Sequence, residues 1–467
     1  MKEWKWSEGW VLLFVIIVSG LIVFFNLWGR SLENHGYTRY AEVAREMVRS
    51  GEWVVPHLNG RIYLDKPPLL FWLIAMPSSL YGSVTPFLAR LPSAFSAWIG
   101  VIILFLWGKR IYGTTQSGLV AGGILLSSYQ YFFQARLAKT DMLLCLFILF
   151  SLYFFDIGYD ESGRRRYLFH GLSFFSIGLG VLTKGPFGLL IPLFIIFVFL
   201  IKEGRWKIWV SKEFMLGYVI LALTVLPWVF LFVHRVGLDR YFTLMKETQI
   251  LSRTAPVYFY FLKIWGEFAP WSVFLPLLFI SLWRRKRGLW HRRESFFLIW
   301  FIVFFILLTL FKVRASRYLL PALPPLALMM GGMWRKSFSI FLVPFFLFIL
   351  IWHGVEFNWV RKNLTYSPGM VLAGELGPLL KDFPLVGYRL DTSTIEEINF
   401  YLDRVIPILT KTDDLSDQLR QEEKRWFLMP KGVYEEIRLQ GDLSTVFLRE
   451  FPYKEGKGRG RLVLVSN

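Results

Sequence analysis

Long apolar stretches alternate with short polar loops along most of this chain. Runs such as 10–27, 187–201 and 296–310 are almost wholly apolar, and they are about as long as a helix that crosses a bilayer needs to be. The pattern predicts about eleven membrane-spanning helices, at 10–28, 87–108, 117–135, 141–157, 168–183, 187–201, 213–234, 269–283, 294–311, 316–334 and 337–355. A shorter apolar segment, 69–80, is expected to be a re-entrant or interfacial piece leading into the second span.

The pattern changes after residue 356. Short strand-like runs at 385–389, 405–409, 425–429, 445–451 and 461–465 alternate with helix-like runs at 393–402, 415–423 and 432–439. We therefore predict a multi-span α-helical membrane domain at 1–356, with an external loop at 29–86, and a small α/β domain at 357–467.

Composition supports a membrane protein. The chain is 55% hydrophobic and 18% aromatic, with a mean hydropathy of +0.45, which is rare for a soluble domain. Its net charge of +19 would suggest nucleic acid in a soluble protein. Here the basic residues concentrate in short loops between spans, so membrane orientation and anionic lipid explain the charge better. Cys145 is the single cysteine, which excludes an internal disulfide.

The basic loops also predict sidedness. With the N-terminus in the cytoplasm, the loops at 109–110, 164–166, 202–212, 284–293 and 335–336 all fall inside, as the positive-inside rule expects. The chain is thus expected to be a multi-pass protein of the plasma (inner) membrane. Its loop at 29–86 and its C-terminal domain would then lie outside, on the periplasmic face.

The stretch Ser31–Trp72 carries the densest set of reactive side chains, among them Glu33, Arg39 and Tyr40. A loop of this length between apolar segments is uncommon unless it is functional or disordered, and its aromatic and β-branched content argues against disorder. Within it, Glu42, Arg45 and Glu46 fit ion pairs inside an amphipathic helix better than a reactive site.

Other ionisable groups lie at the outer ends of distant spans, which predicts one external site that binds an anion, most simply a phosphate. Lys66 precedes two prolines that stiffen its backbone, although a snorkelling lysine would look the same. Asp141 could orient a cation or a substrate amine, or merely cap a helix. Lys184 lies in a tight Thr-Lys-Gly-Pro turn that needs its glycine whatever the lysine does.

These segments resemble the bacterial PMT-like, ArnT-like glycosyltransferases of the GT-C class. The resemblance rests on five segments in order: TRYAEVAREMVRSGEWVVPHLNGRIYLDKPPLLFW at 38–72, ARLPSA at 89–94, KTD at 139–141, LTKGP at 182–186 and KVRASRYLLPALPPLA at 312–327. It covers most of the chain, and the C-terminal tail also resembles that of the lipid A aminoarabinose transferases.

The resemblance implies a GT-C fold and an inverting sugar transfer from a polyprenyl phosphate, such as undecaprenyl phosphate, to lipid A or another envelope acceptor. The sugar would be 4-amino-4-deoxy-L-arabinose or a related one. Implied catalytic residues are Glu33, Arg39 and Asp141, and implied substrate-binding residues are Tyr40, Tyr63, Lys66, Lys184, Glu247, Lys312, Arg314 and Tyr318.

Two positions depart from the family pattern. The acidic residue that precedes the Arg–Tyr pair in such enzymes aligns with Gly36, so Glu33 is the nearest replacement. The family's zinc has an acidic ligand that matches Asp65, but its histidine partner aligns with Thr248, next to Glu247. Asp65 is therefore a weak candidate ligand for a divalent ion, zinc or magnesium.

Two other functions remain open. A transporter or flippase for a lipid-linked sugar would place ionisable groups near the bilayer midplane and show inverted repeats. A catalytically idle family member would bind polyprenyl phosphate without transferring sugar, which the loss of an acid at Gly36 would permit.

Overall fold

The computed structural model describes two compact units. The described residues are 8–29, 31–32, 38–240, 243, 255–284, 292–311, 313–334, 341–351, 354, 368–380, 384–421, 423–439, 445–453 and 460–467. The first unit comprises 1–27, 64–73 and 90–356, and the second comprises 28–63, 74–89 and 357–467. The loop that the sequence groups with the membrane domain therefore belongs largely to the second unit.

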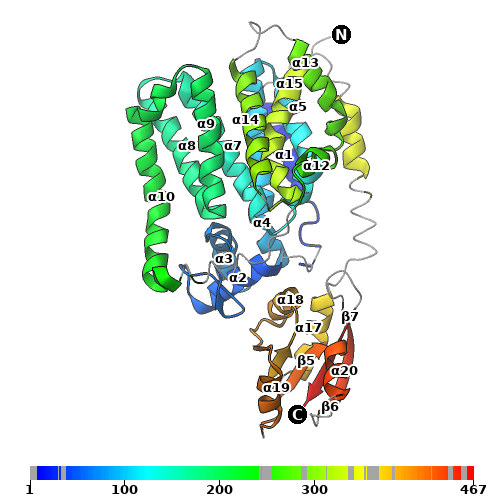
Figure 1. Cartoon of the computed structure of the whole chain (residues 1–467). Helices are drawn as coiled ribbons and strands as arrows, with labels where there is room; N and C mark the ends of the chain where they lie inside the picture. The colour runs from blue at the N-terminus through cyan, green and yellow to red at the C-terminus, as the bar shows by residue number, and fades with distance from the viewer. Residues whose placement is uncertain are drawn as a thin grey trace. The chain divides into compact units, whose positions relative to one another are not determined.

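Helices make up the first unit. Its described elements, together with the two helices that run into it from the second unit, are α1 (Glu8–Phe24), α3 (Leu69–Tyr81), α4 (Pro86–Tyr112), α5 (Thr115–Leu126), α6 (Tyr129–Ala135), α7 (Thr140–Asp160), α8 (Gly163–Lys184), α9 (Pro186–Lys202), η1 (Trp206–Val210), α10 (Lys212–Val236), α12 (Phe259–Glu267), η3 (Trp271–Phe274), α13 (Leu275–Arg284), α14 (Arg292–Leu310), η5 (Ser316–Ala322) and α15 (Leu323–Met333). A further apolar helix spans Phe341–Ile351. Helix α8 packs against α7, α9 and α10 (Figure 1).

Four of the described helices are long and apolar enough to cross a membrane: α4, α7, α10 and α14. The number rises to five if α12 and the Trp271–Arg284 segment, bent by 114°, form one broken span. Several predicted spans correspond to helices shorter than this criterion, such as α1, α5 and α9. The count of eleven stays a prediction.

One predicted span is wrong as a single helix. The segment 117–135 forms two helices, α5 and α6, which are separated at Ser127 and Ser128. Residues from elsewhere bind the break: the Trp271 indole donates to Ser127 Oγ at 2.9 Å, and the Tyr129 N–H donates to the Ala269 backbone carbonyl at 2.9 Å. These partners are over a hundred residues away, so the local pattern does not show them.

Aromatic side chains fill the core between α7, α9 and α14. Phe155 of α7 lies 5.9 Å from Phe199 of α9 and 5.8 Å from Phe296 of α14, between ring centroids. Phe199 and Phe296 are 4.7 Å apart at a steep angle, the edge-to-face geometry that aromatic pairs favour. This core ties α14 to the α7–α8–α9 group.

The second unit contains a five-stranded mixed sheet. Its elements are α2 (Thr38–Ser50), β1 (His57–Leu58), β2 (Arg61–Ile62), α17 (Pro368–Leu379), β3 (Leu385–Tyr388), α18 (Thr392–Leu402), β4 (Ile408–Leu409), α19 (Thr412–Leu419), β5 (Trp426–Pro430), α20 (Lys431–Leu439), β6 (Val446–Tyr453) and β7 (Gly460–Ser466). The strand order is β4-β3-β5-β7-β6, with β3 parallel to β4 and β5, and β7 antiparallel to β5 and β6. Each predicted strand of the tail overlaps one of these strands.

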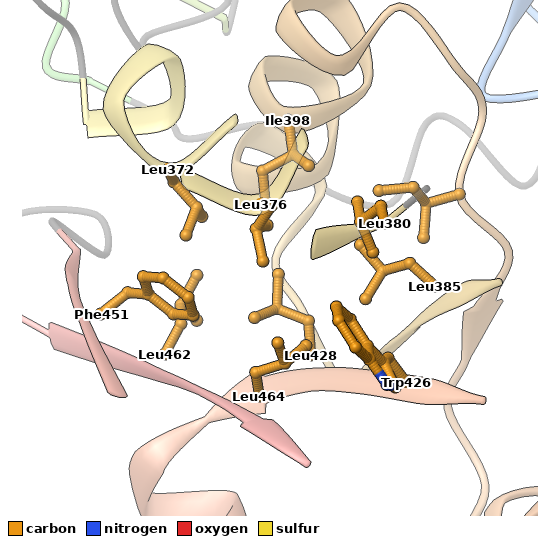
Figure 2. Close-up of a cluster of buried hydrophobic side chains, with 11 residues drawn as sticks. Leu372, Leu376, Leu380, Leu385, Ile398, Trp426, Leu428, Phe451, Leu462 and Leu464 are labelled. Carbon is orange, nitrogen blue, oxygen red and sulfur yellow. The ribbon is translucent and has the colours of Figure 1, made fainter. Parts of the chain in front are cut away.

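Alternating side chains give this sheet two apolar faces. Leu385, Leu428 and Leu464 pack with α17 and α18 on one face, as Figure 2 shows. Val386, Phe427 and Val465, each one residue away in its strand, pack with α19 and α20 on the other face. Helix α17 was not predicted, because its prolines and glycines weaken the helical pattern.

Helix α2, although near the N-terminus, packs against α18 of this unit. Arg39 Nε donates to Glu396 Oε1 at 2.8 Å, and Arg45 Nη1 donates to Asp403 Oδ1 at 3.1 Å. Burial raises the pKa of Glu396, and Arg39 opposes this rise. The predicted ion pair between Glu42 and Arg45 is confirmed, with Nε to Oε2 at 2.8 Å.

Candidate active site

Asp141 is the centre of a charged cluster in the first unit. It lies in the first turn of α7, whose N-cap residue is Lys139, and its side chain is only 6% exposed. The positive end of the helix dipole favours an acid at this position. The carboxylate binds cations from two other elements, so helix stabilisation is only part of its role.

Lys184 is the first of these cations. It is the last residue of α8, and Gly185, with φ of +62°, turns the chain directly into α9. The Lys184 ammonium donates to Asp141 Oδ1 at 2.5 Å and lies 4.3 Å from the centroid of the Tyr318 ring. A cation this close to an aromatic face is attracted by the ring.

Arg317 is the second cation, and it reaches the cluster from η5. Its Nε lies 3.5 Å from Asp141 Oδ2, and its guanidinium carbon lies 5.1 Å from the centroid of Tyr318. One carboxylate therefore lies between two cations, which leaves a net positive charge. Such a group can bind an anion that accepts hydrogen bonds from both nitrogens.

An adjoining pocket has about 460 Å³ of space between its atoms, a volume that includes open solvent at its mouth. Asp141, Lys184, Arg317, Tyr260 and Tyr318 supply its polar atoms. Its other lining residues are apolar: Leu144, Phe187, Ile191, Phe304, Leu308, Phe311, Val313 and Pro321. The pocket thus combines cations and aromatic hydroxyls with an apolar wall, which suits a ligand with a charged head and a hydrocarbon chain.

Tyr260 contributes a buried hydroxyl to this pocket. The residue has no exposed surface, and its hydroxyl makes no hydrogen bond of acceptable geometry with the described residues, although the Ala315 backbone lies near it. A buried hydroxyl without a partner costs free energy, so a ligand that accepts its proton would recover that cost.

The structure brings together only some of the predicted site residues. Asp141, Lys184 and Tyr318 line one pocket. Arg39, Tyr40 and Tyr63 belong to the second unit. Glu33, Glu247 and Lys312 lie outside the described residues, as do Gly36 and Thr248.

Arg314 is not among the residues that line this pocket. Its two terminal nitrogens donate to backbone carbonyls, those of Ala255 and of Thr309. Arg317, three residues later, extends to Asp141 instead. The sequence indicates a basic cluster around 312–317, but it does not show which arginine faces the acid.

Asp65 and Lys66 bind each other. The Lys66 ammonium donates to Asp65 Oδ1 at 2.7 Å and to the Asp65 backbone carbonyl at 2.8 Å. An ammonium on this carboxylate competes with a metal ion for the same oxygen. Within the described part of the chain, no three His, Cys, Asp or Glu side chains come together as a metal site would require. The divalent ion stays a prediction.

Besides Arg317, three residues near the cluster were missed as site residues: Gln130, Tyr260 and Glu267. With its amide oriented to satisfy both neighbours, Gln130 donates to Glu267 at 2.5 Å and accepts from the Arg317 backbone N–H at 3.1 Å. This contact holds the first turn of η5, which carries Arg317 and Tyr318. Such residues have no local sequence signal, because their roles depend on elements far apart in the chain.

Comparisons with known proteins show which proteins this chain resembles in sequence and in fold. The family described as dolichyl-phosphate-mannose-protein mannosyltransferase matches residues 65–230. An undecaprenyl phosphate-alpha-4-amino-4-deoxy-L-arabinose arabinosyl transferase of Edwardsiella ictaluri is 30% identical over 70% of this chain and 60% of its own length. An uncharacterized protein of Aquifex aeolicus is 28% identical over 81% of this chain and 74% of its own length. Except for the Aquifex protein, the chain spans less than two thirds of the relatives that these comparisons give.

Solved structures share the fold. The crystal structure of ArnT from Cupriavidus metallidurans bound to undecaprenyl phosphate aligns over 98% of both chains, with a TM-score of 0.81 and 20% identity. The oligosaccharyltransferase of Archaeoglobus fulgidus aligns over 95% of this chain and 70% of its own, with a TM-score of 0.58 and 11% identity.

The chain therefore has the helical fold of the GT-C membrane glycosyltransferases. In sequence it resembles the mannosyltransferase family over residues 65–230 and the arabinosyl transferase of Edwardsiella ictaluri over 70% of this chain, as the sequence segments indicated.

Proposed function

We propose that this protein is a polyprenyl-phosphate-dependent glycosyltransferase. The observation that supports this proposal best is the pocket in which Lys184 and Arg317 flank Asp141 beside an apolar wall. The two cations suit the phosphate of the donor, and the apolar residues suit its polyprenyl chain.

In this reaction an acceptor oxygen attacks the anomeric carbon of the sugar as the bond from that carbon to the phosphate oxygen breaks. The electron pair leaves with polyprenyl phosphate, and attack from the opposite side inverts the anomeric centre. Lys184 and Arg317 stabilise the negative charge that develops on the leaving phosphate. Asp141 holds both cations in place.

The fate of the acceptor proton depends on the acceptor. A hydroxyl requires a general base, for which Glu33 is our candidate in place of an acid at Gly36. A phosphate on lipid A is already ionised and needs none. If Glu33 is that base, Glu33→Gln abolishes transfer to a hydroxyl acceptor, and unchanged activity removes it from the mechanism.

The proposed donor sugar, the acceptor and the side of the membrane are taken from the resemblance to the related enzymes. We propose an aminoarabinose or similar sugar as donor group, an acceptor such as lipid A, and a site on the periplasmic face, with Arg39, Tyr40, Tyr63 and Lys66 contributing to substrate binding. Arg314, Lys312 and Glu247 stay candidates for the same role. A metal at Asp65 is a separate proposal that a metal analysis of the purified protein tests.

The position of the charged cluster favours an enzyme over a transporter. Asp141 is the second residue of α7, and Lys184 is the last residue of α8. Both therefore lie at helix ends, whereas a transporter would place such groups near the bilayer midplane.

Transfer by the purified protein tests the proposal. Radiolabelled polyprenyl-phosphate sugars and lipid A are incubated with the wild type and with Lys184→Gln, Arg317→Gln and, as a control, the exposed Lys207→Gln. Loss of one charged contact to the leaving phosphate is expected to lower kcat/KM by about a hundredfold or more, while the control retains activity. Binding of undecaprenyl phosphate without transfer from any donor would instead identify an idle family member.

A further inference from the structure

A second charged cluster lies in the first unit, at the other end of α7 from Asp141. Four arginines meet there from different elements: Arg110 near the end of α4, Arg205 after α9, and Arg292 and Arg293 at the start of α14. They surround Tyr159 and Asp160, the last two residues of α7. The proposed transfer reaction uses none of these residues.

Two carboxylates bind three of the arginines. Asp160 accepts from Arg292 at 2.6 Å, from Arg293 at 2.5 Å and from Arg110 at 3.4 Å. Asp156, one turn earlier, lies 3.8 Å from Arg293 and accepts from the Trp107 indole at 3.0 Å. These contacts fix the cluster and compensate only part of its positive charge.

Arg205 has a different partner. Its guanidinium carbon lies 5.1 Å from the centroid of the Tyr159 ring, and that of Arg292 lies 4.3 Å from the same centroid. Among the described residues, Arg205 has no carboxylate within ion-pair distance, and the buried Nε of Arg292 has no hydrogen-bond partner. Two guanidinium groups next to one ring therefore retain donors for an external acceptor.

One further feature increases the positive potential here. The cluster includes the N-terminus of α14, where the helix dipole is also positive. In the first turn of α14, however, Arg292 and Arg293 are followed by the acidic Glu294. Four arginines and two carboxylates leave about two positive charges, which a phosphate group would balance.

We propose that this cluster, formed by Arg110, Arg205, Arg292 and Arg293 around Tyr159, is a binding site for a phosphate-bearing anion. Arginine guanidinium groups bind phosphate through paired hydrogen bonds, and Arg205 and Arg292 provide them. The exposed Trp206 next to Arg205 is typical of a membrane interface, so an anionic phospholipid headgroup is one source of the phosphate. Free phosphate is the other source. This site is independent of the proposed glycosyl transfer.

Ligand-induced stabilisation of the full-length protein tests the site. The melting temperature in detergent is measured with increasing phosphatidylglycerol, with phosphatidylcholine as the zwitterionic reference, and separately with inorganic phosphate against chloride of equal ionic strength. Arg205→Gln is the test variant. It changes an exposed side chain with no carboxylate partner among the described residues, so the variant is expected to fold. Arg164→Gln is the matched control, because it removes an exposed arginine from the first turn of α8, which follows α7 in the chain.

If the site binds phosphate, the melting temperature of the protein rises with phosphatidylglycerol or with inorganic phosphate. The ligand that raises it identifies the source of the phosphate group. Arg205→Gln should bind that ligand about fivefold more weakly, Arg205→Lys should be intermediate, and Arg164→Gln should match the wild type. The proposal is overturned if neither phosphate source stabilises the wild type more than its reference. It is also overturned if Arg205→Gln responds like Arg164→Gln.

Discussion

At the scale of single residues, the candidate site is defined by one acid that is shared between two cations. The sequence predicted that Asp141 and Lys184 would belong to one external site, because the outer ends of distant spans lie on one side, and the family resemblance implied Tyr318; these three residues line one pocket. The sequence indicated Arg314 as a site residue and not Arg317, which lines the pocket instead. That choice depends on the carbonyls of Ala255 and Thr309, which bind Arg314 and are set by tertiary structure.

Tyr260 gives a prediction at this scale. Tyr260→Phe removes only the buried hydroxyl, and this hydroxyl makes no hydrogen bond within the described part of the chain. We expect the variant to be as stable as the wild type and to bind undecaprenyl phosphate about three- to tenfold more weakly, the value of one neutral hydrogen bond.

A titration of undecaprenyl phosphate followed by intrinsic fluorescence measures this effect. Tyr258→Phe serves as the control, because Tyr258 is exposed and precedes the same helix. Unaltered affinity in Tyr260→Phe would mean that the hydroxyl does not contact the ligand.

At the scale of elements, close helix packing sets the position of Lys184. Helices α8 and α9 form a hairpin, and a Cβ at Gly188 would lie 2.0 Å from the Gly180 carbonyl carbon. The helix backbones therefore touch immediately next to Lys184. The sequence indicates the turn between α8 and α9 but not the contact between Gly180 and Gly188. A glycine inside an apolar helix can have several structural causes, so its presence does not identify a close contact.

Gly188→Ala should separate these two helices. We expect a loss of stability of about 1–3 kcal/mol, typical of overpacking, together with reduced transfer as Lys184 moves away from Asp141. Thermal unfolding and transfer assays measure the two effects. Gly266→Ala is the control, because a Cβ there has open space. A Gly188→Ala protein as stable and active as the control would contradict the predicted contact.

The N-cap of α18 gives a second prediction for an element. Asp391 accepts from the N–H groups of Ser393 and Thr394, at 2.9 and 3.0 Å. Burial of this half-buried residue raises the pKa of its carboxyl group, but hydrogen bonds from the hydroxyls and the N–H groups of Ser393 and Thr394 outweigh burial and lower that pKa. Asp391→Ala is expected to cost about 1 kcal/mol, and Asp391→Asn much less, because asparagine also caps helices.

The lowered pKa adds a dependence on pH. The Asp391 carboxyl group binds its proton more weakly in the folded state than in the unfolded state. The resulting stabilisation of the folded state is therefore complete above the pKa of the unfolded state, about 3.9. It is lost as the pH falls through the lower pKa of the folded state. Unfolding of the wild type and of Asp391→Ala should therefore converge in acid. An equal difference in stability at pH 3 and pH 7 would exclude this linkage.

At the scale of the whole molecule, the sequence predicted a helical membrane part and an α/β tail. The described residues form helices in the first unit and, in the tail, a five-stranded mixed sheet with helices on its faces. Apolar runs and alternating strands are strong local signals. The sequence did not predict that residues 28–63 would belong to the same unit as the tail, since that depends on contacts such as Arg39 with Glu396. It also did not show the break in 117–135, which distant partners stabilise.

The predicted sidedness has a direct test, because the single cysteine, Cys145, is buried. Ser162→Cys introduces a thiol in a loop expected to be cytoplasmic, and Asp417→Cys introduces one on the exposed surface of the tail. A membrane-impermeant maleimide should label Asp417→Cys in spheroplasts and label Ser162→Cys only after lysis. The opposite labelling would reverse the assigned orientation.

The packing of α2 against α18 has a consequence for how the protein is made. Helix α2 ends at residue 50, whereas Glu396 and Asp403, which bind its arginines, follow about three hundred and fifty residues later. The ribosome must therefore synthesise most of the chain before α2 gains these partners. During that interval, α2 has its internal Glu42–Arg45 ion pair but not its ion pairs to Glu396 and Asp403, while the intervening helices are inserted. Assembly of this unit is thus among the last steps of biogenesis, and a chain truncated before residue 390 lacks the partners of α2 altogether.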